Sequence, residues 1–293
     1  MVEKLRTPRP RKRTAALAAV AAAGALASFG TAHADEPEGA VTPYIIGGSP
    51  ADQTYSFMIS LQYERDGNPD SHRCGGALVS PEWIVTAAHC VTQDTPDGTP
   101  VVLDPAIFHV RIGSTDRTTG GSVAKIQEIV VHPDYQALPE RSEGDDVALL
   151  RLDAPSDQAP APMASELTEP GTAVRQIGWG YTSNEDKGDP TKLPTQLQQL
   201  DTTVIPPTTP KCVADAGDDS WGIRDEGDVC TDNPEGVRGP CGGDSGSPLL
   251  VREGDGWQVV GVDSRGVGSV CGESPDIYTS VGHFRGWIDS VIS

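Results

Sequence analysis

The sequence has few basic residues for its length. Its 293 residues include 22 Lys and Arg against 42 Asp and Glu, so the formal net charge is −20 at pH 7. A surface of this charge repels phosphate groups, which argues against nucleic acid and anionic lipid as partners. We therefore expect a soluble monomer with no nucleic-acid partner and no membrane partner.

The chain also lacks a long apolar run beyond residue 34, so no later segment is apolar enough to span a bilayer. Residues 1–34 have the features of a signal peptide. Basic residues up to Arg13 precede an Ala-rich run, and Ala32-His33-Ala34 fits a cleavage site. An uncleaved anchor is the alternative, but the run is short and has no stop-transfer flank. We expect a secreted, extracellular protein.

Cysteine is scarce as well, and the six cysteines all follow residue 34 without a CxxC pair or a His-x-x-x-His motif. An even number of cysteines in an exported chain indicates three disulfides, whereas a zinc site would need ligands at such spacings. We expect no metal and no cofactor. The count alone leaves the pairing open.

Short alternating or β-branched runs recur between clusters of Gly, Pro, Asp and Ser, which is the pattern of hairpin-connected strands. They cover residues 57–62, 76–80, 83–86, 108–112, 126–131, 147–152, 174–177, 200–205, 248–251 and 257–262. Helical spacing occurs at the end, over residues 283–292, where Phe284, Trp287, Ile288 and Val291 are apolar. The pattern predicts an all-β, antiparallel fold with a C-terminal α-helix.

Three separate segments carry residues suited to nucleophilic catalysis. Peptide hydrolysis at neutral pH needs a serine hydroxyl, a histidine base and a carboxylate that fixes the histidine tautomer. The chain supplies them as His89 in Thr-Ala-Ala-His-Cys, Asp146 in Asp-Val-Ala-Leu-Leu and Ser245 in Gly-Gly-Asp-Ser-Gly-Ser-Pro. Each residue alone is more often structural, but the three together indicate a catalytic triad.

With Ile45-Ile46-Gly47-Gly48 and Gly178-Trp179-Gly180, these segments resemble the trypsin and chymotrypsin family over residues 45–293. The resemblance implies two six-stranded antiparallel β-barrels with the active site in the cleft between them. It also implies a serine endopeptidase that hydrolyses protein or peptide substrates through an acyl-enzyme.

Within that resemblance, Ser245 is the nucleophile, His89 the base and Asp146 the orienting carboxylate. Asp145 competes for the last role, but the family places its aspartate directly before the apolar run, which favours Asp146. The backbone N–H groups of Gly243 and Ser245 would form the oxyanion hole. The implied disulfides are Cys74–Cys90, Cys212–Cys230 and Cys241–Cys271.

The resemblance also implies activation by cleavage. In the family a new N-terminal ammonium pairs with the buried aspartate next to the nucleophile, here Asp244, and Ile45 matches that N-terminus. Residues 35–44 would then be an activation propeptide. Tyr44 stands where animal members have Arg or Lys. We expect a zymogen cleaved after Tyr44 by an aromatic-directed or broad protease, this enzyme included.

The substrate pocket departs from trypsin. Gly239 falls at the pocket floor, where trypsin-like enzymes have Asp, whereas Asp276 falls on the back wall and Gly266 leaves the entrance open. We expect a mixed preference for basic and large apolar side chains before the cleaved bond. Broad-specificity collagenolytic proteases of crustaceans carry the same exchange, which suggests fibrous substrates. The alternative is that Asp276 turns away and the preference is apolar.

The cleft rim is expected at Ser264-Arg265-Gly266, which matches the family segment that pairs with substrate backbone. Arg265 replaces the usual aromatic residue, so an exposed guanidinium would favour a carboxylate on the second or fourth substrate residue. A solvated or salt-bridged arginine is the alternative.

Two other classes are less consistent with the chain. An α/β-hydrolase esterase has a Gly-x-Ser-x-Gly elbow and the order Ser, Asp, His, but Ser245 comes last here. A binding protein on an inactive protease scaffold usually loses a triad residue, and all three are present.

Overall fold

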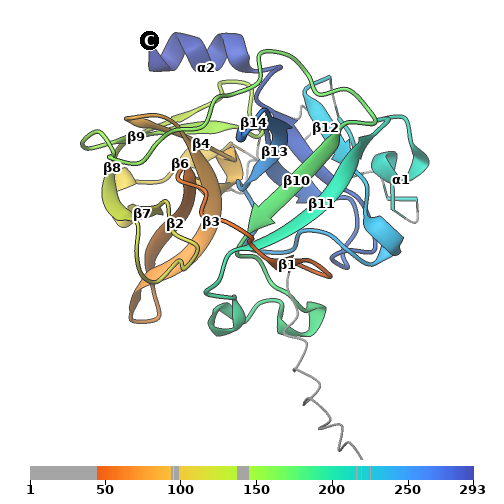
Figure 1. The fold of residues 1–293 in the computed structure, drawn as a ribbon, viewed down its shortest axis with the longest axis horizontal. Helices are drawn as coiled ribbons and strands as arrows, with labels where there is room; N and C mark the ends of the chain where they lie inside the picture. Colours follow the sequence, from red (N-terminus) through yellow and green to blue (C-terminus); the bar gives the residue numbers. More distant parts are fainter. Residues whose placement is uncertain are drawn as a thin grey trace, which may run out of the picture. The chain divides into compact units, whose positions relative to one another are not determined.

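The computed structural model describes residues 45–293 except 94, 96–98, 137–144, 216, 219 and 225. The expected signal peptide and activation propeptide, residues 1–44, lie outside the described residues. Strands dominate the described chain, and helix α2 (Arg285–Ile292) ends it, close to the helix expected over residues 283–292 (Figure 1). In the described part, no helix has the length and apolar character needed to cross a membrane.

The first half of the described chain forms a closed antiparallel barrel, in the order β2-β3-β4-β9-β8-β7 (Figure 1). Its strands are β2 (Met58–Arg65), β3 (Asn68–Ser80), β4 (Trp83–Thr86), β7 (Phe108–Ile112), β8 (Ser122–Val131) and β9 (Ala148–Leu152). In β7, Phe108, Val110 and Ile112 are buried while His109 and Arg111 are partly exposed. This period of two points alternate side chains into the barrel.

The second half forms another antiparallel sheet, in the order β1-β11-β10-β13-β14-β15-β12. An additional pairing of β12 with β11 closes six of these strands into a barrel. Strand β1 is the seventh and pairs with the start of β11. The strands are β1 (Ser49–Pro50), β10 (Ala173–Gly178), β11 (Gln198–Ile205), β12 (Asp228–Thr231), β13 (Pro248–Glu253), β14 (Gly256–Gly266) and β15 (Asp276–Ser280). The expected fold of two six-stranded barrels is confirmed.

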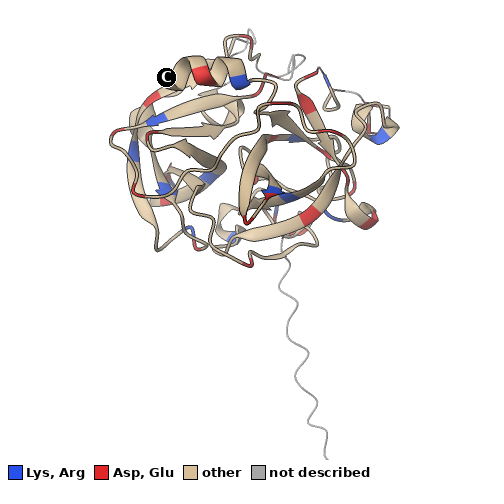
Figure 2. Ribbon diagram, turned by 45° about the horizontal axis from the view of Figure 1, so that its top comes forward, with Lys and Arg blue, Asp and Glu red and all other residues tan. Residues whose placement is uncertain are grey.

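The remaining elements are short. They are β5 (Thr92–Gln93), which pairs with β6 (Val101–Val102), helix α1 (Pro210–Val213), and the 3₁₀ helices η1 (Ala88–Cys90), η2 (Pro105–Ile107), η3 (Asn184–Asp186), η4 (Pro190–Lys192) and η5 (Pro234–Gly236). Strands β3 and β4 of the first barrel contact β13 and β14 of the second. Figure 2 shows acidic and basic positions interspersed over both barrels.

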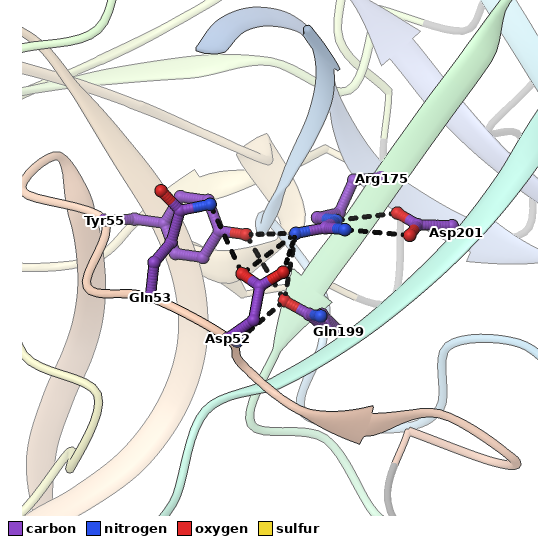
Figure 3. Close-up of polar contacts among 6 residues, drawn as sticks. All are labelled: Asp52, Gln53, Tyr55, Arg175, Gln199 and Asp201. Carbon is purple, nitrogen blue, oxygen red and sulfur yellow. Dashed lines mark hydrogen bonds and ion pairs between the residues drawn. The ribbon is translucent and has the colours of Figure 1, made fainter. Parts of the chain in front are cut away.

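Arg175 on β10 fixes the segment that follows Ile45 to the second barrel (Figure 3). Its Nη1 donates to both oxygens of Asp52 at 3.0 and 2.9 Å, and its Nε and Nη2 donate to Asp201 at 2.6 and 2.8 Å. The hydrogen-bonded Asp201 and the neighbouring Tyr55 and Asp52 hold the pKa of Arg175 well above its usual range. The network anchors the chain just downstream of the expected cleavage.

Candidate active site

Two paired strands bring His89 and Asp146 together. Helix η1 carries His89 just after β4 and Asp146 lies just before β9, and Thr86 of β4 pairs with Ala148 of β9. His89 Nδ1 lies 2.7 Å from Asp146 Oδ2, and the backbone N–H of His89 donates to Asp146 Oδ1 at 2.9 Å. Because an ionised carboxylate only accepts, Nδ1 carries the proton and Nε2 keeps the basic lone pair.

Asp146 is buried and has a third donor. The hydroxyl of Ser264 donates to Asp146 Oδ2 at 2.7 Å. The neighbouring Asp145 instead faces His132, with 3.8 Å between its Oδ1 and the His132 Nδ1. Of the two adjacent aspartates, Asp146 is therefore the one whose carboxylate contacts His89.

Ser245 lines the same cleft as His89, a cavity of about 520 Å³. The backbone N–H of Gly75 on β3 donates to the carbonyl of Ser245 at 2.8 Å, so the first barrel holds the backbone of the serine. Gly243 has a φ of 100°, and a Cβ there would lie 2.9 Å from a methyl carbon of Leu193. Both the left-handed backbone and the close approach require glycine at this position.

His72, which was not predicted from the sequence, orients the Gly243 peptide. His72 Nε2 lies 2.8 Å from the carbonyl oxygen of Gly243, and its Nδ1 lies 2.7 Å from Ser60 Oγ. The carbonyl only accepts, so Nε2 carries the proton and Nδ1 accepts from the Ser60 hydroxyl. Burial lowers the pKa of His72 to about 4, which keeps it neutral. No local sequence pattern marks His72, because its partners are distant in the chain.

Asp244 is 1% exposed and lies against Gly178 and Gly180. Its Oδ1 accepts from the backbone N–H of Gly180 at 2.7 Å and its Oδ2 from that of Cys241 at 2.9 Å. A Cβ on Gly178 or Gly180 would come within 2.0 or 2.2 Å of the carboxylate, which explains both glycines of the Gly-Trp-Gly segment. Burial raises the pKa of Asp244 to about 7. Among the described residues, Asp244 makes no ion pair with a cationic side chain, and Ile45 is fully buried.

A second cavity, of about 390 Å³, adjoins Ser245 and is lined by Gly266 and Asp276. A Cβ on Gly239 would lie 2.7 Å from Asp276 Oδ2, and one on Gly266 would lie 3.4 Å from Oδ1. The carboxylate of Asp276 therefore lies between Gly239 and Gly266.

The expectation of an exposed guanidinium at Arg265 is wrong. The Arg265 side chain is 2% exposed and forms an ion pair with Asp228, which is fully buried. It also donates to the carbonyl of Gly222 and to Ser264 Oγ, both at 3.0 Å. A buried guanidinium needs a carboxylate partner, and the Asp228 that supplies it is 37 residues away in the chain. Arg265 still lines the cleft, but its charge is neutralised there.

Trp221 is a cleft residue that was not predicted from the sequence. Trp221 lines both the cleft and the adjoining pocket. Asp215, Asp218 and Lys187 line the cleft as well. The aromatic surface that Arg265 does not supply therefore comes from a loop between α1 and β12, which has no strand or helix pattern to locate it.

The three expected disulfides are present: Cys74–Cys90, Cys212–Cys230 and Cys241–Cys271. The first joins β3 to η1 and so holds the helix that carries His89. The sulfur atoms of Cys74 and Cys90 lie within 4.8 Å of a ring nitrogen of His89. Their disulfide leaves no thiolate to bind a metal there.

Two closed antiparallel barrels, with a buried aspartate bonded to a partly exposed histidine and a serine in the same cleft as that histidine, define the class of two-barrel serine proteases. A sequence model of the family described as Trypsin matches residues 45–288. The chain belongs to the trypsin family. Membership makes it a serine endopeptidase, a hydrolase whose substrates are peptides.

Proposed function

We propose that the chain is exported as a precursor and becomes a serine endopeptidase with Ser245 as nucleophile, His89 as base and Asp146 as orienting carboxylate. The observation that carries this proposal is the 2.7 Å contact of His89 Nδ1 with Asp146 in a cleft that Ser245 also lines. Asp146 has three hydrogen-bond donors, which holds the imidazole in the tautomer that a base requires.

The reaction follows from these positions. Ser245 Oγ bonds to the scissile carbonyl carbon while His89 Nε2 takes the hydroxyl proton. The backbone N–H groups of Gly243 and Ser245 stabilise the resulting oxyanion, a contribution of about 10²–10³ in rate per donor. The C–N bond breaks, and His89 gives the proton to the leaving amine. Water then attacks the acyl-enzyme by the same route and releases the acid.

Activation is proposed to follow cleavage after Tyr44, which frees the α-amino group of Ile45. Support comes from the buried Asp244 carboxylate, which has two neutral N–H donors but no cationic side chain among the described residues. An ammonium from the buried Ile45 would offset the cost of holding that charge. The pairing would fix the loop that carries Gly243 and Ser245.

The proposed preference before the cleaved bond is mixed, with basic side chains attracted by Asp276 and large apolar ones admitted past Gly266. The enzyme is proposed to act outside the cell as a monomer, without a nucleic-acid or membrane partner. Three disulfides suit an oxidising compartment, and the net charge of −20 disfavours binding to phosphates. Fibrous proteins such as collagen are candidate substrates.

Fluorophosphonate labelling tests the proposal. The mature protein should react at Ser245 and hydrolyse a protein substrate, whereas Ser245→Ala should do neither. Hydrolysis of esters alone would point to an esterase, and a protein that neither reacts nor hydrolyses would be a binding protein. N-terminal sequencing of the active form should give Ile45, and a fully active form that retains residues 35–44 would exclude the activation step.

A further inference from the structure

The pocket beside Ser245 contains a second carboxylate that the sequence analysis did not single out. Asp263 on β14 is 5% exposed and lines the same 390 Å³ cavity as Asp276 on β15. These strands are antiparallel neighbours, and Asp263 pairs with Tyr278, two residues from Asp276. Residues two apart share a face of the sheet, so both aspartates lie on the side that faces the pocket.

Neither carboxylate has a hydrogen-bond donor among the described residues. Asp263 Oδ1 is buried without a hydrogen-bond partner, and no described side chain or backbone N–H donates to the carboxylate of Asp276. Two cations line the cavity: Arg265 is paired with Asp228, and Lys187 donates to the carbonyl of Ser269 at 2.8 Å. Burying a carboxylate without protein donors costs free energy, and a ligand that brings donors offsets that cost.

We propose that Asp263 and Asp276 together form a two-carboxylate site for the cationic side chain of the substrate, with Asp263 as a second specificity-determining residue. An ammonium or guanidinium would donate to both carboxylates, one on each strand. This inference rests on the proposed function, because it takes the cavity beside Ser245 as the place of the side chain before the cleaved bond.

The paired acids also make substrate choice depend on pH. Burial raises the pKa of both groups well above the usual value. The charges of Asp244 and Asp146 raise the pKa of Asp263 further, and those of Asp263 and Asp244 raise the pKa of Asp276 further. The charged or titratable groups around them are Asp244, Asp146 and Tyr278, with Arg265, whose charge favours ionisation of Asp263, and Lys187, which lines the same cavity.

The direction of the effect follows from these surroundings. At lower pH the carboxyl groups are protonated and the pocket is neutral, which suits Leu or Phe. As the pH rises the pair ionises and selects Lys or Arg. Binding of a cation favours the ionised form, so a proton is released to solvent when the pair was protonated.

The test is the ratio of kcat/KM for two peptide amides that differ only in Lys or Leu before the cleaved bond. Taking the ratio cancels every pH effect on the catalytic chemistry itself, because such effects act on both substrates alike. From about pH 5 to about pH 9 the Lys/Leu ratio should rise about tenfold or more in the wild type. In Asp263→Asn the rise should be smaller, and the ratio at high pH about tenfold lower, with Leu cleavage retained.

Two further variants separate an effect of the pocket carboxylates from a general effect of removing an acidic side chain. Asp276→Asn should lower the ratio as well, while Asp255→Asn, in an exposed turn between β13 and β14, should leave it unchanged. A wild-type ratio that does not change with pH would overturn the inference, as would an Asp263→Asn ratio that matches the wild type at every pH. Labelling of Ser245 by a fluorophosphonate shows whether the proposed function itself has failed.

A measurement on the unaltered enzyme covers the case in which Asp263→Asn does not fold. Benzamidinium should inhibit competitively, more strongly at higher pH, and its binding near neutral pH should release protons in calorimetry with buffers of different ionisation enthalpy. Inhibition that is independent of pH and releases no proton would overturn the two-carboxylate site.

Discussion

The catalytic region and the substrate pocket both contain buried aspartates, but the carboxylates of the two regions differ in their hydrogen-bond donors. Asp146 accepts from the backbone and ring of His89 and from the Ser264 hydroxyl. Asp263 and Asp276 have no donor in the described part of the chain, and both line a cavity. A carboxylate with a full set of donors is fixed and charged, as an orienting group must be. One without donors is available to a ligand that supplies them.

The largest effect is expected on kcat in the catalytic region, where the Asp146 carboxylate has all its hydrogen-bond donors. Ser245→Ala, His89→Ala and Asp146→Asn should each lower kcat by about 10⁴ or more, and double variants should be scarcely worse because the three residues act as a unit. Steady-state kinetics with thermal unfolding checks both activity and fold. Turnover of Ser245→Ala within a few-fold of the wild type would show that the nucleophile is another residue.

Asp244 lies between the two extremes, with two neutral donors and no cation among the described residues. Its pKa of about 7 in the folded precursor is above the usual 3.8, so the folded form binds the proton more tightly. The stabilising contribution is complete below about pH 4 and is lost as the pH rises to about 7, a change of roughly 4 kcal/mol. Urea unfolding of the precursor should show this fall, and Asp244→Asn should flatten it.

The pH dependence of stability should differ between the precursor and the mature protein. An Ile45 ammonium would stabilise the charged carboxylate, so the loss of stability between about pH 4 and 7 should shrink after cleavage. The ammonium, whose pKa is raised by Asp244, would instead lose its proton at alkaline pH, and activity should fall there. Equal pH profiles of stability for the precursor and the mature form would contradict the pairing.

A smaller effect is expected at the buried ion pair of Arg265 and Asp228. Asp228→Asn leaves a buried guanidinium without its counter-charge and should lower the unfolding free energy by about 3 kcal/mol. Because Arg265 is neutralised in the native protein, a substrate with Glu in its second position should gain nothing over one with Leu. A preference for Glu in the wild type that is lost in Arg265→Met would contradict this expectation, because it would show that the guanidinium contacts the substrate.

The smallest effect is expected on the surface, where Arg285 pairs with Asp289 at 2.8 Å on helix α2. Asp289→Asn should change the unfolding free energy by less than about 1 kcal/mol, because both side chains are partly exposed and the pair is screened. It is the matched control for Asp228→Asn. Equal losses in the two variants would show that burial does not set the strength of these pairs.

The sequence predicted most of the strands and the main catalytic candidates because their signals are local. The runs expected at residues 83–86 and 108–112 coincide with β4 and β7, where apolar side chains are continuous or alternate. Strands β12 and β15 were missed, since each begins with an aspartate whose burial depends on distant partners or on the pocket.

The same limit applies within the site. The burial of Arg265 depends on Asp228, and the role of His72 depends on Gly243, 171 residues away. Asp263 lies directly beside the predicted rim segment, yet only the register of β14 against β15 shows that it faces the pocket with Asp276. Local patterns therefore predicted the candidate catalytic residues, whereas tertiary contacts between distant residues determine which buried charges have a partner.

The central claim is that Ser245 forms the acyl-enzyme in a protein that begins at Ile45. It is tested most directly by trapping the intermediate at low pH with an activated ester and mapping the adduct by mass spectrometry of the digested protein. We expect one acyl group on Ser245, in chains whose N-terminus is Ile45, and none in Ser245→Ala. An adduct on another residue, or the same yield from chains that retain residues 35–44, would contradict it.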